Sequence, residues 1–415
     1  MAVIYWVALQ CYGLGIRLAS LFSAKAKDWV QGRRRWKSHL RQAVKHLPQE
    51  RIWIHCASLG EFEQGRPVIE LLRKHYPQQA IVLSFYSPSG YHIRKDYDQV
   101  DHVCYLPLDS PANAQAFVDI LQPSLALFVK YELWYGYLRA LHRAAIPTYL
   151  FSAIFHPKHV FFKWYGGLFR QMLRWMTLIL VQTEPSKVLL RQIGIERVVV
   201  TGDTRIDRVF QLAQAADPIT VVDQFKAGAP LLVIGSCWPE DEALLYDLFH
   251  HSLPAHWKVV MAPHDISERH IQQIEQQLPL PNVRYSQANE DTLAQSRVLL
   301  IDNIGLLSRI YQYGTIAYIG GGFGAGIHNT LEPLSFGLPV IIGPKYDRFE
   351  EAVQLVEAGG VFAIRDTASL QQVFEALLLP ENYQRASATA AQFIRSNSGA
   401  SARTLEHIKP TLVDG

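Results

Sequence analysis

From residue 51 onward, short and almost wholly apolar runs alternate with stretches of helical length and mixed polarity. Apolar runs of this kind are typical of strands that are buried on both faces of a sheet. In the first half they predict strands at 51–57, 79–86, 102–106, 124–130, 147–151, 177–182 and 197–201. After a polar, helical stretch at 205–228, the pattern predicts further strands at 230–236, 257–262, 297–301, 316–320, 339–342 and 361–364.

The alternation of strands and helices with short connections predicts α/β domains with parallel, doubly wound sheets. A chain of 415 residues is too long for one typical core. We therefore expect two Rossmann-like domains, at 49–210 and 211–384, that face each other across a cleft. A C-terminal helix at 385–415 would follow and cross back to the first domain. Ligands of such sheets bind beyond the carboxyl ends of the strands, so the strand-to-helix corners are the candidate sites.

The N-terminus has a different pattern. Residues 1–16 contain no charge, whereas residues 25–45 carry eight Lys or Arg against one acid, Asp28. Sixteen helical residues reach roughly 24 Å, which is short of a roughly 30 Å hydrocarbon core. We expect an uncleaved hydrophobic membrane anchor at 1–24 and a basic segment at 25–48 on anionic head groups. Spanning, dipping in and lying flat all remain open, as does an ordinary buried helix with a solvated basic face.

Composition narrows the choice of function. The chain is 49% hydrophobic and 19% charged, with a formal net charge of +3, so a nucleic-acid partner is not expected. The four cysteines are far apart and form no CxxC pair, which favours a reducing compartment and argues against structural zinc. HExxH, GxSxG and a suitably placed DxD pair are also missing from the sequence. We therefore expect no metal site and no cofactor.

The corners of the second half point to a nucleotide. In YIGGGFGAGIHNTLEPL, at 318–334, five glycines follow a strand, and a helix is expected to begin near Asn329. Free N–H groups at a helix start bind phosphate, and Glu332 would accept hydrogen bonds from ribose hydroxyls. A tight turn without a ligand is the alternative. Two other corners offer Ser236 and His264, whose alternatives are an ordinary helix start and a satisfied loop histidine.

The corners of the first half offer two acids and a cation. Ser58 and Glu61 fit the S-x-x-E capping box, so Glu61 is either a helix cap or a general base. A helix N-terminus lowers the pKa of a carboxyl, whereas an apolar and water-poor cleft raises it. The second corner presents Glu132 beside Trp134. The third presents Arg205 between two acids, either as a surface ion pair or as a cation for a leaving phosphate.

Taken together, these corners resemble the Kdo transferase family, in which Kdo is 3-deoxy-D-manno-octulosonic acid. The resemblance covers nearly the whole chain, and single phrases such as VKYELW are most similar to the branch found in Bacteroidetes-type bacteria. The motifs that carry it are S-x-G-E (58–61), Y-E-L-W (131–134), G-D-T-R-x-D (202–207), A-P-H (262–264), D-x-I-G-x-L (302–307) and G-I-H-N-T-L-E-P (326–333).

The resemblance implies the glycosyltransferase B fold and an enzyme on the cytoplasmic face of the inner membrane. Its reaction would transfer Kdo from CMP-Kdo to a lipid A precursor of the lipid IVA type, in lipopolysaccharide core biosynthesis. Transfer would be metal-independent and inverting. Domain 49–210 would bind the acceptor and domain 211–384 the donor.

By position in the motifs, the resemblance makes Glu61 the general base, with Glu132 and Arg205 supporting the transition state. The implied CMP contacts are Pro263, His264, Gly305, Leu306, Leu307, Asn329, Thr330, Leu331 and Glu332, with further donor contacts at Ser236, Gly322 and Gly326. The sequence departs from the family pattern at His264, where arginine is usual, at Leu306, where glutamate is usual, and at Phe323, where serine is common.

The acceptor lipid has a candidate contact in residues 161–176, where aromatic side chains alternate with Lys163, Arg170 and Arg174. A core-facing helix is the equal alternative. Three other functions stay open: a transferase of the same fold that uses another nucleotide sugar, a sugar-nucleotide epimerase, and a silent, membrane-tethered nucleotide-binding module.

Overall fold

The computed structural model describes residues 2–412, which form two compact units. Unit 1 contains the residues up to Arg208 and those from Ser398 onward, and unit 2 spans Val209–Asn397. The first boundary thus falls two residues before the expected one at 210/211. Residues 1 and 413–415, which belong to the expected anchor and C-terminal helix, lie outside the described residues.

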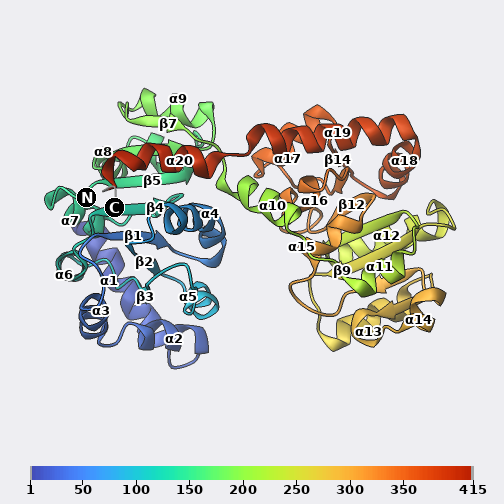
Figure 1. Ribbon diagram of the computed structural model, residues 1–415, viewed down its shortest axis with the longest axis horizontal. Helices are drawn as coiled ribbons and strands as arrows, with labels where there is room; N and C mark the ends of the chain where they lie inside the picture. Colours follow the sequence, from blue (N-terminus) through green and yellow to red (C-terminus); the bar gives the residue numbers. More distant parts are fainter. Residues whose placement is uncertain (1, 413–415) are drawn as a thin grey trace. The chain divides into compact units, whose positions relative to one another are not determined.

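Unit 1 is built on one parallel sheet of seven strands, in the order β3-β2-β1-β4-β5-β6-β7 (Figure 1). Strand β1 pairs with β2 on one side and with β4 on the other, so the order reverses between β1 and β4. The strands are β1 Arg51–Cys56, β2 Ala80–Phe85, β3 His102–Tyr105, β4 Leu125–Val129, β5 Thr148–Ala153, β6 Leu178–Val181 and β7 Val198–Val200.

Each face of this sheet packs against its own layer of helices. Because successive strand residues point to opposite faces, Trp53 joins one core cluster while Ile52 and Ile54 join the other. The first cluster includes residues of α3 (Trp36–Val44), α6 (Pro111–Leu121), α7 (Tyr135–Arg143), α8 (Gly167–Arg174) and α9 (Glu184–Gln192). The second includes residues of α4 (Leu59–His75), α5 (Pro88–Arg94) and α20 (Ala400–Ile408). The almost wholly apolar strands follow from burial on both faces.

Unit 2 repeats the architecture with the strand order β10-β11-β9-β8-β12-β13-β14, again all parallel, and reverses between β8 and β12. Its strands are β8 Leu231–Cys237, β9 Lys258–Pro263, β10 Asn282–Arg284, β11 Val298–Leu300, β12 Ile316–Ile319, β13 Val340–Ile342 and β14 Val361–Ala363. Its longer helices are α12 Pro239–His251, α13 Glu268–Gln277, α17 Glu350–Ala358, α18 Thr367–Leu378 and α19 Pro380–Asn397. The edge strand β10 was not predicted, because its three residues, NVR, contain a single apolar side chain and so give no apolar run.

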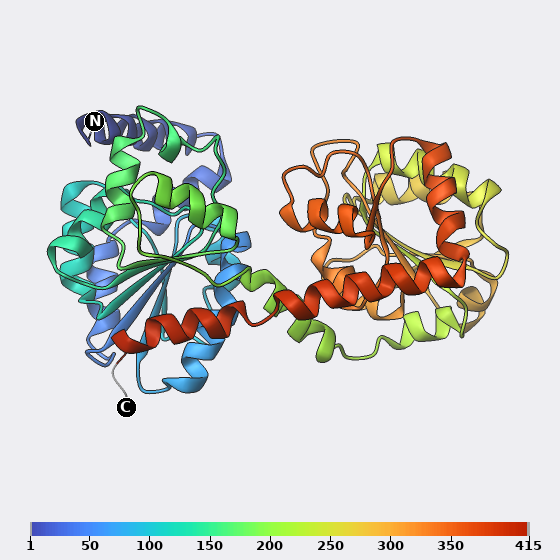
Figure 2. The same cartoon turned by 90° about the horizontal axis from the view of Figure 1, so that it is seen from above.

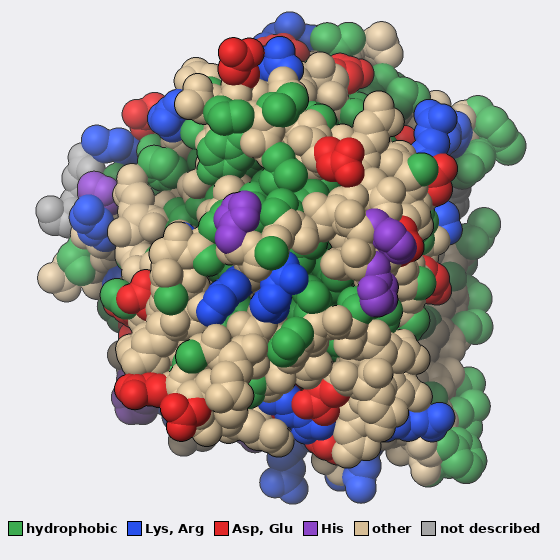
Figure 3. Space-filling model, turned by 90° about the vertical axis from the view of Figure 1, so that its right-hand side faces the viewer, with side chains coloured by type: hydrophobic (Ala, Val, Ile, Leu, Met, Phe, Trp, Pro, Cys, Tyr) green, Lys and Arg blue, Asp and Glu red, His purple; other side chains and the backbone are tan. Residues whose placement is uncertain are grey.

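Shorter elements complete the two units. They are α2 Ala24–Gly32, α11 Thr220–Lys226, α14 Glu290–Gln295, α15 Leu307–Ile310, α16 Leu331–Ser335, η1 Val160–Phe162, η2 Tyr285–Gln287, η3 Tyr311–Tyr313 and η4 Lys409–Thr411. On the side of the molecule that carries α13 and α18, acidic, basic and apolar side chains are interspersed (Figure 3).

The expectation of one helix at 385–415 is wrong. Helix α19 ends at Asn397, and α20 begins at Ala400 and packs on α4 of unit 1. Gly399 between them has φ +88°, a conformation that favours glycine. Asp207, near the start of α10 (Thr204–Gln214), accepts hydrogen bonds of 2.5 Å from the N–H groups of Gly399 and Ser401. This acid of the G-D-T-R-x-D motif therefore holds the returning chain on unit 1.

The N-terminal helix α1 (Ala2–Ala19) passes the length and apolarity test for a membrane span, yet one of its faces is docked on unit 1 (Figure 2). The hydroxyl of Tyr5 donates to the fully buried Asp109 at 2.7 Å, and Trp6 packs edge-on against Tyr135. Gly13 lies so close to Leu108 that an added Cβ would come within 2.8 Å. The remaining face is exposed and apolar through Val3, Ile4, Val7, Leu14 and Leu18, and it continues into Leu21 and Phe22.

Candidate active site

The two predicted acids of unit 1 lie at the point where its strand order reverses. Glu61 stands in the first turn of α4, directly after β1, and Glu132 follows β4. Strands β1 and β4 are neighbours, although two strands separate them in the sequence. The crevice at such a switch point is where doubly wound sheets bind ligands. The topology therefore brings both carboxyl groups to one place.

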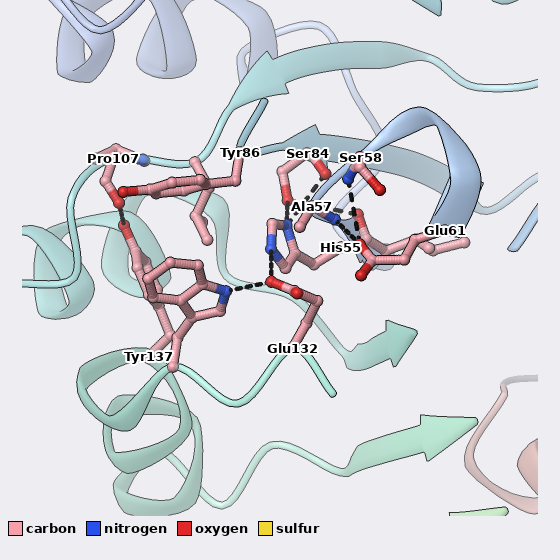
Figure 4. A network of polar contacts seen from close by, with 12 residues as sticks. His55, Ala57, Ser58, Glu61, Ser84, Tyr86, Pro107, Glu132 and Tyr137 are labelled. Atoms are coloured by element: carbon pink, nitrogen blue, oxygen red, sulfur yellow. Dashed lines mark hydrogen bonds and ion pairs between the residues drawn. The ribbon is translucent and has the colours of Figure 1, made fainter. Parts of the chain in front are cut away.

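Glu61 is both a helix cap and a perturbed acid. Its Oε2 accepts hydrogen bonds from the N–H groups of Ala57, at 2.5 Å, and Ser58, at 3.2 Å (Figure 4). Burial, and next the charge of Glu132, raise the pKa of the Glu61 carboxyl from its ordinary 4.5 to about 7, against the opposing effect of both N–H groups and of Lys130. Desolvation thus outweighs the helix start. A carboxyl with this pKa is suited to general-base work near neutral pH.

Glu132 is held by two ring systems. Its Oε2 accepts a hydrogen bond from Trp134 Nε1 at 2.8 Å and lies 3.4 Å from His55 Nε2. His55, fully buried on β1, has its Nδ1 3.1 Å from the carbonyl oxygen of Ser84. The Ser84 hydroxyl lies closer to Nδ1, at 2.9 Å, and can donate to it, which leaves the ring proton on Nε2, facing the Glu132 carboxylate. The two contacts fix the orientation of the Glu132 carboxylate (Figure 4).

Sequence reasoning missed His55, because the strand RIWIHCA was interpreted only as an apolar run. A signal was present: a histidine inside a strand buried on both faces needs polar partners. Its partners are Ser84 on β2 and Glu132 beyond β4, and these are the two strands that flank β1.

Arg205 lies at the start of α10, in the same unit. Its guanidinium pairs with Asp203 through an Nε contact of 2.8 Å and a terminal-nitrogen contact of 2.6 Å. The preceding residue, Thr204, is fully buried and donates to the carbonyl of Gln64 on α4, one turn after Glu61. The structure therefore brings Arg205 towards α4, the helix that carries Glu61. Arg205 also forms, with Asp203, the ion pair that the sequence offered as one alternative.

In unit 2 the switch point between β8 and β12 carries a cavity of about 280 Å³. Five predicted residues line it: Ser236, Gly305, Leu307, Asn329 and Glu332. The other lining residues, which sequence reasoning missed, are Ser308, Tyr311, Ile319 and His328. Ser236 adopts φ +53°, a left-handed conformation that is unusual for a residue other than glycine. Such strain is concentrated at functional corners.

Beside this cavity three rings form a stack. Trp238 lies 4.3 Å from His264 between ring centroids, and His264 lies 4.8 Å from His328. Trp238 Nε1 donates to His328 Nε2 at 3.1 Å, so the proton of His328 sits on Nδ1. Burial, and next the nearby His264, lower the pKa of His328 below 6.5. His264, where arginine was usual, is thus an exposed stacking residue next to the cavity.

The glycine-rich loop has tight backbone contacts. An added Cβ at Gly322 would come within 2.6 Å of the Cα of Gly343, and Gly326 has φ +126°. Both glycines therefore have a structural reason to be there, and their donor contacts stay predictions. The helix expected from Asn329 begins at Leu331, where Asn329 Oδ1 accepts a hydrogen bond from the N–H of Leu331, and it has five residues. Its N-terminal dipole is correspondingly small.

Several predicted donor residues lie outside the cavity lining. Pro263, Thr330 and Leu331 are buried, while Leu306 is half-buried and precedes α15. Their backbone groups remain the candidate contacts. Glu332 and Asn329 meet through a hydrogen bond of 3.0 Å, from the Asn329 amide to a Glu332 oxygen.

The stretch 161–176 is mainly core. Phe161 and Met172 are buried, and the Arg170 guanidinium donates to the carbonyls of Phe161 and Lys163. Only Trp164, 90% exposed, and Tyr165 stand out as large exposed apolar side chains of this stretch. The core-facing alternative therefore holds for most of it.

Two parallel, doubly wound sheets with ligand corners at both switch points define the class of protein, an α/β protein with the glycosyltransferase B fold. A UDP-GlcNAc 2-epimerase from Neisseria meningitidis bound to UDP-GlcNAc has this fold, with a TM-score of 0.61 at 18% identity, over 87% of this chain and all of that one.

Residues 34–208 match the family described as 3-deoxy-D-manno-octulosonic-acid transferase (kdotransferase). The chain is 29% identical to the 3-deoxy-D-manno-octulosonic acid transferase of Haemophilus influenzae over 382 residues, which cover 88% of each chain. It is 26% identical to that of Bordetella pertussis over 385 residues, or 87% of each. The chain is thus similar to the Kdo transferase family of glycosyltransferases, over residues 34–208 for the family and over most of its length for these two relatives. A Bacteroidetes branch stays a prediction.

Proposed function

We propose that this protein transfers Kdo from CMP-Kdo to a lipid A precursor of the lipid IVA type, in lipopolysaccharide core biosynthesis. The observation that supports this most is Glu61, a largely buried carboxyl with a pKa of about 7 at the switch point of unit 1. A family of Kdo transferases needs a base for a sugar hydroxyl, and Glu61 has the pKa for that task.

In the proposed reaction Glu61 removes the proton of an acceptor hydroxyl. The hydroxyl oxygen then forms a bond to the anomeric carbon of Kdo, the bond from that carbon to the phosphate oxygen breaks, and CMP leaves. One displacement of this kind inverts the configuration. The Ala57 and Ser58 N–H groups hold the Glu61 carboxylate before the acceptor binds. Glu132, fixed by Trp134, supports the transition state.

The donor nucleotide belongs in the cavity of unit 2. Glu332 accepts hydrogen bonds from the ribose hydroxyls, and the Asn329 amide donates to them. The backbone around Gly305 and Leu307 contacts the base. Arg205, which forms an ion pair with Asp203, supplies a cation for the leaving phosphate. Because CMP leaves with a single phosphate, the developing charge is modest, and we propose that transfer needs no metal.

The exposed face of α1 and the following basic residues support a place on the cytoplasmic face of the inner membrane. The docked face of α1 is tied to Asp109, and the helix exposes large apolar side chains such as Val7 and Leu14. A helix bound along one side to its domain favours lying in the interface over spanning it. Lys25 and Lys27 would then face anionic head groups.

The test is incubation with CMP-Kdo, generated in place, and a tetra-acylated lipid A precursor, with mass spectrometry to count the Kdo residues added. We expect transfer by the wild type and at least a hundredfold loss in Glu61→Gln. Glu63→Gln, which changes a neighbouring carboxylate of α4 that pairs with Arg94, is the matched control and should keep its turnover. Wild-type turnover in Glu61→Gln would refute the base assignment. Protection by UDP in place of CMP would refute the donor.

A further inference from the structure

Unit 1 also contains a cavity, which the proposed chemistry does not use. It has a volume of about 280 Å³ and lies among α1, α2 and the corner between β2 and α5. Its walls are formed mainly by the apolar and aromatic residues Tyr12, Ile16, Ala26, Trp29, Tyr86 and Pro88. An apolar cavity of about 150 Å³ already holds a benzene ring, so this one has room for a longer aliphatic segment.

The cavity is adjacent to the candidate active site. Tyr86, one of its walls, packs on Trp134 in a tilted arrangement with ring centroids 4.6 Å apart, and the Trp134 indole donates to Glu132. The opposite end of the cavity is formed by α1 and α2, next to the exposed Leu18, Leu21 and Phe22.

One polar feature of the cavity selects among apolar ligands. Lys25 and Ser23 stand in its lining at the start of α2, so a cation faces whatever enters from the helix side. An acyl chain on a phosphorylated lipid fits such a cavity, because its apolar part contacts the aromatic wall while its phosphate pairs with a cation.

We propose that this cavity binds one acyl chain of the lipid acceptor, and so places the acceptor sugar at Glu61 and Glu132. The inference rests on the proposed function and adds the position of the acceptor lipid. Three observations together select this occupant: the aromatic contact with the catalytic network, the exposed apolar Leu21 and Phe22 that lead into the lining residue Ser23, and the cation at the rim. The chain enters from the membrane side, while the aromatic wall of Tyr86 limits its depth.

The test fills the cavity with a bulky side chain and varies the length of the acyl chains of the acceptor. Ala26→Trp introduces bulk into the lining, whereas Ala24→Trp makes the same change at an exposed residue of α2 outside it. The acceptor KM is measured for lipid A precursors with full-length and shortened acyl chains, together with the KM for CMP-Kdo. We expect at least a tenfold rise in KM for the long-chain acceptor in Ala26→Trp only, an unchanged KM for CMP-Kdo, and a loss of the dependence on chain length. Thermal unfolding checks that both variants fold.

A second measurement keeps this inference separate from the proposed function. An acceptor with a photoreactive group at the end of one acyl chain is cross-linked to the wild type, and labelled peptides are identified by mass spectrometry. Labels on the segments around Tyr12–Ile16 and Ala26–Trp29 support the cavity. Labels elsewhere, or an unchanged acceptor KM in Ala26→Trp while the wild type still transfers Kdo, would overturn it and leave the proposed function standing. A wild type that transfers no Kdo refutes the proposed function, and the cross-link still decides the cavity.

Discussion

Replacing Glu61 by Gln should abolish turnover and at the same time stabilise the fold. The carboxyl has a pKa of about 7 in the folded protein, against an ordinary value of 4.5. Between these pH values the folded state holds the proton more tightly than the unfolded chain does. The free energy of unfolding therefore falls as pH rises from about 4.5 to 7, and it keeps the lower value above pH 7. Gln mimics the protonated acid and escapes this loss.

The size of the effect follows from the shift. A difference of about 2.5 pKa units corresponds to about 3 kcal/mol. Less than 1 kcal/mol of it is present at pH 5 and nearly all at pH 8, so the advantage of the variant should grow by about 2–3 kcal/mol between the two. For a unit of this size that is a relative gain of about 5–10 °C in Tm. The side-chain carbonyl of Gln still accepts from the Ala57 N–H, so the capping contact persists.

The assay is thermal unfolding of the detergent-solubilised chain at pH 5, 6, 7 and 8, with the wild type and the variant compared at each pH. Other titrating groups cancel in that difference. Glu63→Gln serves as the control and should show no gain that grows with pH. A gain that is equal at pH 5 and pH 8, or a loss at pH 8, would refute the idea that burial of a charged base costs stability here.

Three further changes test other parts of the argument. Glu132→Gln removes the second cause of the raised pKa of Glu61 and should move the acid limb of the kcat–pH profile below pH 7. An unmoved limb would mean that the charge of Glu132 does not raise the pKa of Glu61. Tyr5→Phe deprives the buried Asp109 of a donor and should cost about 1–3 kcal/mol by urea unfolding, whereas a neutral result would mean that α1 is not held there. Gly320→Ala would place a Cβ 2.4 Å from the Cα of Cys237 and should weaken CMP binding in calorimetry. Gly324→Ala has no contact closer than 3.7 Å and should bind CMP as the wild type does.

The fold was largely predictable because parallel strands buried on both faces leave a strong apolar signal. Of the fourteen strands in residues 2–412, thirteen were predicted, including β1 and β8, and the edge strand β10 was missed. The break between α19 and α20 also had a signal in the sequence, Ser398-Gly399, which the long helical pattern on either side concealed.

Contacts between side chains were harder to predict, because spacing along the chain does not contain them. Asp109 is a single acid in the loop PLDSP, and its role as the acceptor for Tyr5 and α7 depends on where α1 docks. His55 reaches Glu132 only because β4 lies beside β1, which is a crossover in strand order. Similarly, the pairing of Arg205 with Asp203 is one of the two that the acids beside it allowed.

Glu61 shows why local and tertiary effects must be weighed together. The motif S-x-x-E predicts a helix cap, and the cap is present, since the carboxylate accepts the N–H groups of Ala57 and Ser58. On its own this would give an acid of low pKa and a poor base. The topology of unit 1 then places the same residue in a buried corner beside Glu132, and the pKa rises to about 7. The cap orients the carboxylate while burial makes it basic, so the two interpretations of the sequence describe two functions of one side chain.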